Sequence, residues 1–302
     1  MSSPDEIVQS ENAMSFKHRV FGKWILAGEH AVLRGHTAMV FPVTSCYFEI
    51  EYKPSPNKIN LTCDSDQGEQ MKMVFMGLLN KALSDLGKET TELTGELSIV
   101  NRIPLVGGMG ASAAICVSVV KFLNHLGFVE EEKIFSFAKS LEDLFHGESS
   151  GVDVAIALQA RPLLYKIGEF IPFEPKWKPY LHLSHCGKRG VTADCIRRVK
   201  KLWQTNESLG QMIDLDMQRS FELAQKAMSR PDSVHELQQS ILLARSCFER
   251  WGLVSVELSE HMNELHKLGA IATKPTGSGD GGFVLSLWDQ KPTATSIDLL
   301  EC

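Results

Sequence analysis

The chain has 302 residues, of which 43% are hydrophobic and 23% are charged, and 31 basic against 37 acidic residues give a net charge of −6 at pH 7. A chain of this length is long enough for about two domains and a sizeable core. The composition excludes a disordered or fibrous protein. The negative net charge argues against a general nucleic-acid binder, which needs a basic surface. It does not argue against a local basic pocket that binds one polyphosphate.

The cysteines and the N-terminus bear on where the protein works. The seven cysteines are scattered along the chain and form no C-x-x-C pair, so we expect neither a disulfide framework nor a zinc site. A reducing, cytoplasmic location fits this pattern. No apolar run reaches the ~18 residues of a membrane span, so we expect no membrane partner. Residues 1–15 are polar and acidic, which predicts a disordered tail rather than a signal peptide.

The first half of the chain mixes short apolar runs with segments of helical periodicity. Apolar runs broken by glycines predict strands with tight turns over 16–50. An apolar stripe with helical spacing predicts helices over three segments, 64–86, 111–126 and 130–147. Strands are predicted over 95–103, before Pro104, and in the runs VDVAIAL and PLLYKIG that follow Gly151.

The second half is richer in amphipathic helices. Three prolines between 172 and 179 mark a predicted linker, which divides an N-terminal domain, 16–175, from a C-terminal domain, 176–302. The predicted elements after it are a strand YLHLSHCG, amphipathic stretches over 192–209, 215–228 and 235–251, a helix VELSEHMNELHKLGA and a strand FVLSLW.

One segment that could take part in binding or catalysis is GGMGASAA, residues 107–114, between a predicted strand and a predicted helix. Glycines let backbone N–H groups approach a ligand, and a helix start adds free donors and a positive dipole, so the corner suits phosphate. Ser112 could reach a metal or a phosphate oxygen. Two alternatives remain: a plain glycine-rich turn, and a dinucleotide fingerprint, G-x-G-x-x-A over 108–113. The fingerprint also needs an acid after a second strand, whereas the acids at 130–132 open a helix.

A second glycine-rich loop lies in TKPTGSGDGGFVLSL, residues 273–287. Gly277, Gly279 and Gly282 also fit the dinucleotide fingerprint G-x-G-x-x-G, but a strand rather than a helix follows them, which excludes a dinucleotide site. Lys274 and Thr276 could flank a polyphosphate in this loop. The alternative is a simple hairpin turn.

The third segment is HGESSGVDVAIAL, residues 146–158. Asp153 stands among small residues before an apolar run, where a rigidly held carboxylate could meet a substrate hydroxyl. The alternative is a turn aspartate that binds local backbone N–H groups. Glu142, on the preceding predicted helix, would by itself be a solvated surface residue.

Taken in order, four segments resemble the motifs of the GHMP kinase superfamily: GKWILAGEHAVLRG, IPLVGGMGASAA, HGESSGVD and KPTGSGDGGF. They cover 22–287, and the GEHAV sequence favours the mevalonate kinase branch. The resemblance implies a two-domain α/β (α+β) fold, with an N-terminal domain like the second domain of ribosomal protein S5 and a ferredoxin-like C-terminal domain. It also implies ATP-dependent phosphorylation of the hydroxyl of mevalonate, with ATP across the phosphate loop and the substrate between the domains.

The resemblance assigns roles to individual residues. Asp153 would accept the proton of the substrate hydroxyl, and Lys23 would stabilise that carboxylate and the attacking oxygen. Ser112 and Glu142 would hold Mg²⁺. The phosphates of ATP would lie on Gly107, Gly108, Met109, Gly110, Ala111 and Ser112. The positions expected near the acceptor are Glu29, His30, Thr276 and Gly277.

Some positions depart from the family pattern and keep alternatives open. Asp280 stands in a loop that is normally all glycine, where its carboxylate would repel phosphates unless it points outward or meets the metal. Lys188 or Arg189 could pair with a substrate carboxylate, the alternative being two solvated cations. The acceptor could also be phosphomevalonate, homoserine or a sugar. A homologue that binds ATP and a metabolite without turnover is a further alternative, and the long C-terminal helices could pair two copies in a homodimer.

Overall fold

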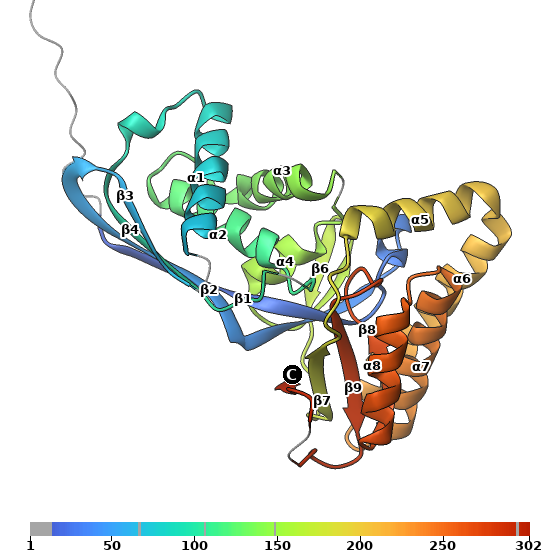
Figure 1. Cartoon of the computed structure of the whole chain (residues 1–302). Coiled ribbons are helices and arrows are strands. Elements are labelled where there is room, and N and C mark those ends of the chain that lie inside the picture. Colours follow the sequence, from blue (N-terminus) through green and yellow to red (C-terminus); the bar gives the residue numbers. More distant parts are fainter. Residues whose placement is uncertain (1–13, 66–67, 106, 148, 294–295) are drawn as a thin grey trace, which may run out of the picture.

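The computed structural model describes residues 14–65, 68–105, 107–147, 149–293 and 296–302 (Figure 1). The predicted disordered tail over 1–15 falls outside these residues, except for its last two positions. The described chain forms two β-sheets with helices packed against them. None of the described helices is long and apolar enough to span a membrane.

The N-terminal sheet is built on one long antiparallel ribbon. Strand β1 (Phe16–Ala27) pairs with β2 (Ala38–Lys58), and the other strands extend the sheet in the order β3-β4-β2-β5-β6. The added strands are β3 (Asn60–Asp64), β4 (Thr94–Asn101), β5 (Leu163–Lys166) and β6 (Glu169–Pro172). Among the described strands of this sheet, only β3 and β4 run parallel to each other.

Four helices lie on one face of this sheet: α1 (Gly68–Asp85), α2 (Ala111–His125), α3 (Ile134–His146) and α4 (Val152–Gln159) (Figure 1). Helix α2 is apolar on all sides and is buried from Ala113 to Val120. A helix without a polar face needs neighbours all around it, which explains its central position between α1, α3, α4 and the sheet. Its N-terminus is thereby fixed in a rigid part of the core.

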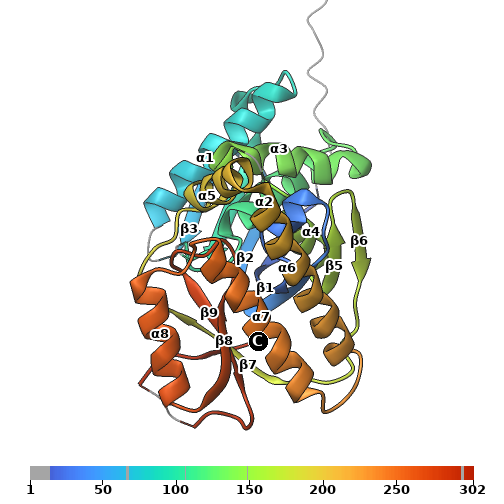
Figure 2. The same ribbon diagram turned by 90° about the vertical axis from the view of Figure 1, so that its right-hand side faces the viewer.

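The C-terminal half forms a second, antiparallel sheet in the order β10-β7-β9-β8. Its strands are β7 (Tyr180–His185), β8 (Ala270–Pro275), β9 (Phe283–Trp288) and β10 (Leu300–Glu301). Its helices are α5 (Thr192–Thr205), α6 (Glu207–Met228), α7 (Val234–Arg250) and α8 (Val256–Lys267) (Figure 2). Helices α7 and α8 pack on β8, while α6 also contacts β1 and β2 of the first sheet. One continuous apolar core therefore includes side chains from both halves.

Most of the expected elements are present, but the structure also differs from the expectation, and two of the differences affect the site. The predicted helices over 64–86, 111–126 and 130–147 correspond to α1, α2 and α3. The prediction of a strand for VDVAIAL is wrong, because these residues form α4. A short apolar run without polar interruptions has no period that separates a buried strand from a buried helix. The sequence pattern also does not predict β8, which turns the second glycine-rich segment into a β8–β9 hairpin.

Candidate active site

A cavity of about 560 Å³ lies where loops from both halves of the chain meet. All four sequence motifs contribute to its wall. The lining includes Lys23, Glu29, His30, Gly107, Gly108, Met109, Gly110, Ala111, Ser112, Glu142, Asp153 and Gly277. Folding thus brings together residues that are up to 255 positions apart in the sequence, since the lining runs from Lys23 to Ser278.

Lys23 and Asp153 form an ion pair at the cavity wall. The Lys23 Nζ lies 3.0 Å from Oδ1 of Asp153, and the lysine side chain is only 5% exposed. Lys23 is on β1, and Asp153 is in the first turn of α4, which begins after Gly151 in the left-handed region at φ 81°. Backbone N–H groups and the positive end of α4 favour a carboxylate at that position. The structure therefore places the predicted base and cation in direct contact.

Residues 107–110 form a glycine-rich turn into the N-terminus of α2. Gly107, Gly108 and Gly110 all have positive φ, at 116°, 81° and 77°. Gly110 caps α2, and a Cβ at this residue would lie 3.0 Å from Cγ of Lys23. The first turn of a 15-residue helix therefore opens on the cavity next to the Lys23–Asp153 pair. Free N–H groups and helix dipole make this turn a site for an anion such as a phosphate.

Glu142 is buried in the same wall and is not the solvated surface residue that its helix position alone suggests. Its side chain is 2% exposed, and its Oε2 atom has no hydrogen-bond partner among the described residues. Burial, and secondly the negative charge of Asp153, raise the pKa of Glu142 to about 8. An unsatisfied buried carboxylate oxygen beside another carboxylate is a natural ligand for a divalent cation. Ser112 lines the same cavity, so these residues fit the predicted Mg²⁺ site.

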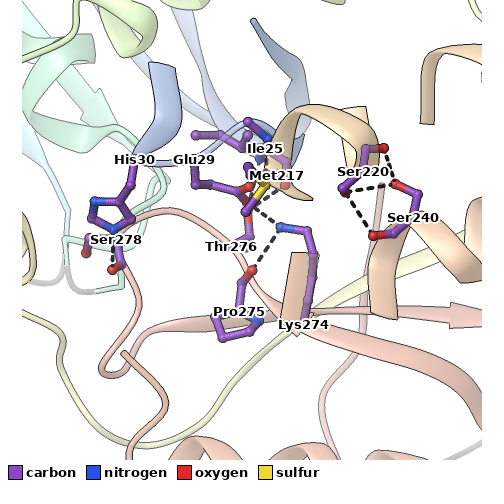
Figure 3. Close-up of polar contacts among 11 residues, drawn as sticks. Ile25, Glu29, His30, Met217, Ser220, Ser240, Lys274, Pro275, Thr276 and Ser278 are labelled. Carbon is purple, nitrogen blue, oxygen red and sulfur yellow. Dashed lines mark hydrogen bonds and ion pairs between the residues drawn. The ribbon is translucent and has the colours of Figure 1, made fainter. Parts of the chain in front are cut away.

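Glu29 and His30 occupy the loop after β1 and line the cavity. The ring Nε2 of His30 lies 2.9 Å from the carbonyl oxygen of Ser278. Burial lowers the pKa of His30 to about 4, so the ring is neutral near pH 7 and donates this hydrogen bond. Glu29 forms an ion pair with Lys274 (Figure 3). Lys274 is fully buried and faces Glu29, so the hypothesis that it flanks a polyphosphate is wrong.

Thr276 connects the second glycine loop to β1. Its hydroxyl accepts a hydrogen bond from the backbone N–H of Ile25 at 2.9 Å and donates one to the Ile25 carbonyl at 3.1 Å. Gly277 and Ser278 line the cavity, whereas Thr276 is buried behind them. The hydroxyl at 276 thus holds the loop in place, next to the position predicted for the acceptor.

Asp280 points away from the cavity, which resolves the conflict between its charge and a bound phosphate. Its carboxylate lies 3.1 Å from Arg198 and 4.0 Å from Lys188, and it is not part of the cavity wall. Its backbone N–H donates to the carbonyl of Leu253 at 2.7 Å. The extra carboxylate therefore ties the glycine loop to α5 and its preceding loop.

One part of the cavity wall could not be found from motifs. An apolar end is formed by residues of α1, of the segment before the phosphate loop and of α2. These residues are Met71, Val74, Pro104, Leu105 and Ile115, with Gln70 at the edge. In the sequence they have the spacing of ordinary core residues, so nothing in the local pattern distinguishes them. Arg189, from the loop before α5, lies in the wall as well, whereas Lys188 pairs with Glu257 at 3.2 Å.

Comparison with known proteins identifies relatives of the chain. Residues 77–161 match a family model described as the GHMP kinases N terminal domain. The chain is 25% identical to a mevalonate kinase of Pyrococcus abyssi, over 92% of this chain and 90% of the relative. It is 26% identical to a mevalonate kinase of Archaeoglobus fulgidus, over 91% and 94%.

Solved structures share the fold. A crystal structure of L. major mevalonate kinase in complex with R-mevalonate superposes with a TM-score of 0.74 at 23% identity, covering 96% of this chain and 90% of that chain. The mevalonate kinase of Methanococcus jannaschii gives a TM-score of 0.73 at 17% identity, covering 97% and 99%.

The fold and the cavity together point to one class of protein: the chain has the fold of the GHMP kinases, and its residues 77–161 match the N-terminal domain of that family. Two archaeal relatives that match 92% and 91% of its length are mevalonate kinases.

Proposed function

We propose that the protein transfers the γ-phosphoryl group of ATP to a hydroxyl of mevalonate, giving phosphomevalonate and ADP. The observation that carries this proposal is the Lys23–Asp153 pair, 3.0 Å apart, beside the open N-terminus of α2 in one cavity. Phosphoryl transfer needs positioning and charge neutralisation more than covalent chemistry by the protein, and this cavity offers both.

Each group at the cavity has a specific task in this reaction. The Asp153 carboxylate accepts the proton of the acceptor hydroxyl as its oxygen attacks the γ-phosphorus. The Lys23 ammonium stabilises the negative charge that develops on that oxygen. The backbone N–H groups of residues 107–112 hold the phosphates of ATP in line with the attacking oxygen. The apolar end formed by α1 and α2 is suited to the adenine ring, because a flat base loses apolar surface to water there.

We infer that Ser112 and Glu142 hold the Mg²⁺ ion that accompanies ATP. The unpartnered Oε2 of Glu142 and its position beside Asp153 support this assignment. When bound, the cation neutralises phosphate charge. Without a cation, burial keeps the Glu142 carboxyl group protonated near pH 7. A cation bound beside it would favour the ionised carboxylate.

The acceptor would lie between Asp153 and the loops that follow β1 and β7. Mevalonate carries a carboxylate as well as hydroxyls, and Arg189 supplies a guanidinium in the cavity wall that can bind it. The two archaeal relatives at 25% and 26% identity support this acceptor over a sugar.

The proposal is tested by measuring ADP release with ATP, Mg²⁺ and a panel of acceptors: mevalonate, phosphomevalonate, homoserine and galactose. We expect release with mevalonate alone. Release with another member of the panel would keep the kinase and replace the acceptor. No release with any acceptor, while ATP still binds in a calorimetric titration, would overturn the enzymatic proposal in favour of a non-catalytic binding protein.

A further inference from the structure

The turn that leads into α4 carries Asp153 but has no task of its own in the proposed reaction. Residues 149–153 form one part of the cavity wall, and Gly151 caps α4 with φ 81° and ψ 0°. A glycine is conformationally permissive, so its own preferences do not hold the backbone in one orientation. Since Asp153 follows two residues later, the direction of its carboxylate depends on what fixes this turn.

A buried tyrosine fixes the turn from behind the cavity wall. Tyr165 of β5 is 1% exposed, and its hydroxyl donates a hydrogen bond to the carbonyl oxygen of Ser150 at 2.5 Å. Strand β5 contacts α4, and the tyrosine ring shares an apolar cluster with Val152 (Figure 2). A Cβ at Gly151 would lie only 2.8 Å from the tyrosine oxygen. Tyr165 therefore holds the peptide that joins Ser150 to Gly151.

An aspartate of α3 holds the same turn at its other end. Oδ1 of Asp143 accepts a hydrogen bond from the backbone N–H of Ser149 at 2.7 Å, and Oδ2 pairs with Lys139 at 2.9 Å. The turn is thus bonded to side chains of two other elements, β5 and α3. Neither Asp143 nor Tyr165 is among the described residues of the cavity wall, so neither is placed to contact ATP or the acceptor. Any influence of these side chains on the reaction must pass through the turn.

The Tyr165 hydroxyl remains a hydrogen-bond donor at neutral and moderately alkaline pH. Burial, and secondly the negative charges of Glu142 and Asp153, raise the pKa of Tyr165 to about 12. The phenol is therefore close enough to both carboxylates to sense their charge, and it keeps its proton while they are ionised.

We propose that Tyr165 is a positioning residue for the transfer step, whose buried hydroxyl fixes the turn before α4 and thereby the direction of the Asp153 carboxylate. Asp143 supports the same turn. The inference rests on the proposed function, since it takes Asp153 as the base that accepts the proton. A base displaced by a fraction of an ångström transfers the proton less efficiently, although the binding of both substrates is unchanged.

A purely structural role for the hydroxyl is the competing explanation, and the chain offers a matched control for it. Tyr52 of β2 is 3% exposed, and its hydroxyl donates to the carbonyl oxygen of Thr94 at 3.0 Å. The next residue, Gly95, has φ 111°, and a Cβ there would lie 2.5 Å from the Tyr52 ring. Tyr52 therefore has the same arrangement of tyrosine, carbonyl and left-handed glycine, but it is not among the described residues of the cavity wall.

The test compares the wild type, Tyr165→Phe and Tyr52→Phe in the ADP-release assay, with the acceptor that the wild type phosphorylates. Phenylalanine keeps the ring and its packing and removes only the hydroxyl. We expect kcat of Tyr165→Phe to fall roughly tenfold, with KM for ATP and for the acceptor within about twofold of the wild type. Tyr52→Phe should lower the melting temperature by a similar amount and keep the wild-type kcat.

A double variant tests whether Tyr165 acts through Asp153. In the Asp153→Asn background, Tyr165→Phe should lower the remaining kcat by less than about twofold, because the base that the tyrosine positions is already absent. Asp143→Ala should lower kcat as well. Asp143→Asn should recover most of that loss, because its amide oxygen still accepts the hydrogen bond from Ser149.

The inference is overturned if a folded Tyr165→Phe keeps the wild-type kcat, or if Tyr52→Phe loses as much turnover. It is equally overturned if Tyr165→Phe causes its full loss in the Asp153→Asn background. If Tyr165→Phe does not fold, Asp143→Ala decides the question, and wild-type turnover in that variant overturns the inference. A wild type that phosphorylates no acceptor overturns the proposed function and this inference together, whereas the other outcomes concern the inference alone.

Discussion

Single charged side chains at the cavity owe their properties to burial. Lys23 and Glu142 would lie in water on most strands and helices, yet here they are 5% and 2% exposed. The sequence predicts which residues gather at the site, because the four motifs contain them. It cannot predict their burial, or that Lys274 turns to Glu29 rather than to a phosphate, since both depend on which segments pack together after folding.

His30 leads to a prediction about stability and pH. Its pKa is about 4 in the folded protein, against about 6.5 in an unfolded chain. Between these values the unfolded chain binds more protons, so the free energy of unfolding must fall as the pH falls from 6.5 towards 4. At pH 5, relative to pH 7.5, this one residue should reduce the free energy of unfolding by about 2 kcal/mol.

The measurement is urea unfolding of the wild type and of His30→Gln at pH 7.5 and at pH 5. The pH-dependent loss should be about 2 kcal/mol smaller in the variant, because glutamine does not titrate. The buried ring of His18, whose pKa is also lowered to about 4, contributes equally to both proteins and cancels. Equal losses in the two proteins would contradict the assignment of a neutral, buried His30.

At the scale of elements, the site depends on two helix N-termini, those of α2 and α4. The glycine-rich segment before α2 is readable in the sequence, because three glycines between a strand and an apolar helix have few other uses. The start of α4 cannot be predicted from the sequence, because VDVAIAL has no polar residue after Asp153 that would reveal a helical periodicity. In the structure, Asp153 occupies the first turn of a helix, where backbone N–H groups favour its charge, and not the start of the predicted strand.

Gly110→Ala tests whether the tight turn before α2 positions Lys23. The new Cβ would lie 3.0 Å from Cγ of Lys23, so the lysine side chain that pairs with Asp153 must shift by a few tenths of an ångström. Displacement of a catalytic group by a fraction of an ångström should reduce kcat roughly tenfold to a hundredfold. The control is Gly127→Ala, which has nearly the same φ, 76°, and no described atom within 4 Å of the added Cβ.

Both variants carry the strain of a left-handed backbone, so both should be destabilised by about 1 kcal/mol. Only Gly110→Ala should lose turnover when the folded enzymes are compared in the ADP-release assay. A parallel loss in Gly127→Ala would mean that general destabilisation, and not the turn, determines the rate.

On the scale of the whole molecule, the two halves share one core, and their loops meet at the cavity. The sequence predicts a pair of domains divided near residue 175, which stays a prediction; β6 and β7, on either side of that point, belong to different sheets. It does not predict that α6 packs on the first sheet, because this contact joins distant segments without any local pattern. The resemblance of four ordered motifs supplies the overall architecture that periodicity alone does not.

Thr276→Val tests the contact that joins the halves at β1. The substitution keeps the volume but removes both hydrogen bonds to Ile25, whose buried N–H and carbonyl groups would then be unpaired. We expect a loss of about 2–3 kcal/mol in the free energy of unfolding, and a smaller loss for Thr276→Ser, which keeps the hydroxyl. If urea unfolding shows equal stability for all three proteins, the hydroxyl at 276 does not join the halves.

The central claim is that the carboxylate of Asp153, held by Lys23, removes the proton of the acceptor hydroxyl at the end of bound ATP. The most direct measurement is turnover of Asp153→Asn with ATP, Mg²⁺ and mevalonate, alongside calorimetric titration with ATP. Because asparagine keeps the shape but cannot accept the proton, kcat should fall by about 10²–10⁴ while ATP affinity stays within about twofold. Wild-type turnover in Asp153→Asn would contradict the account.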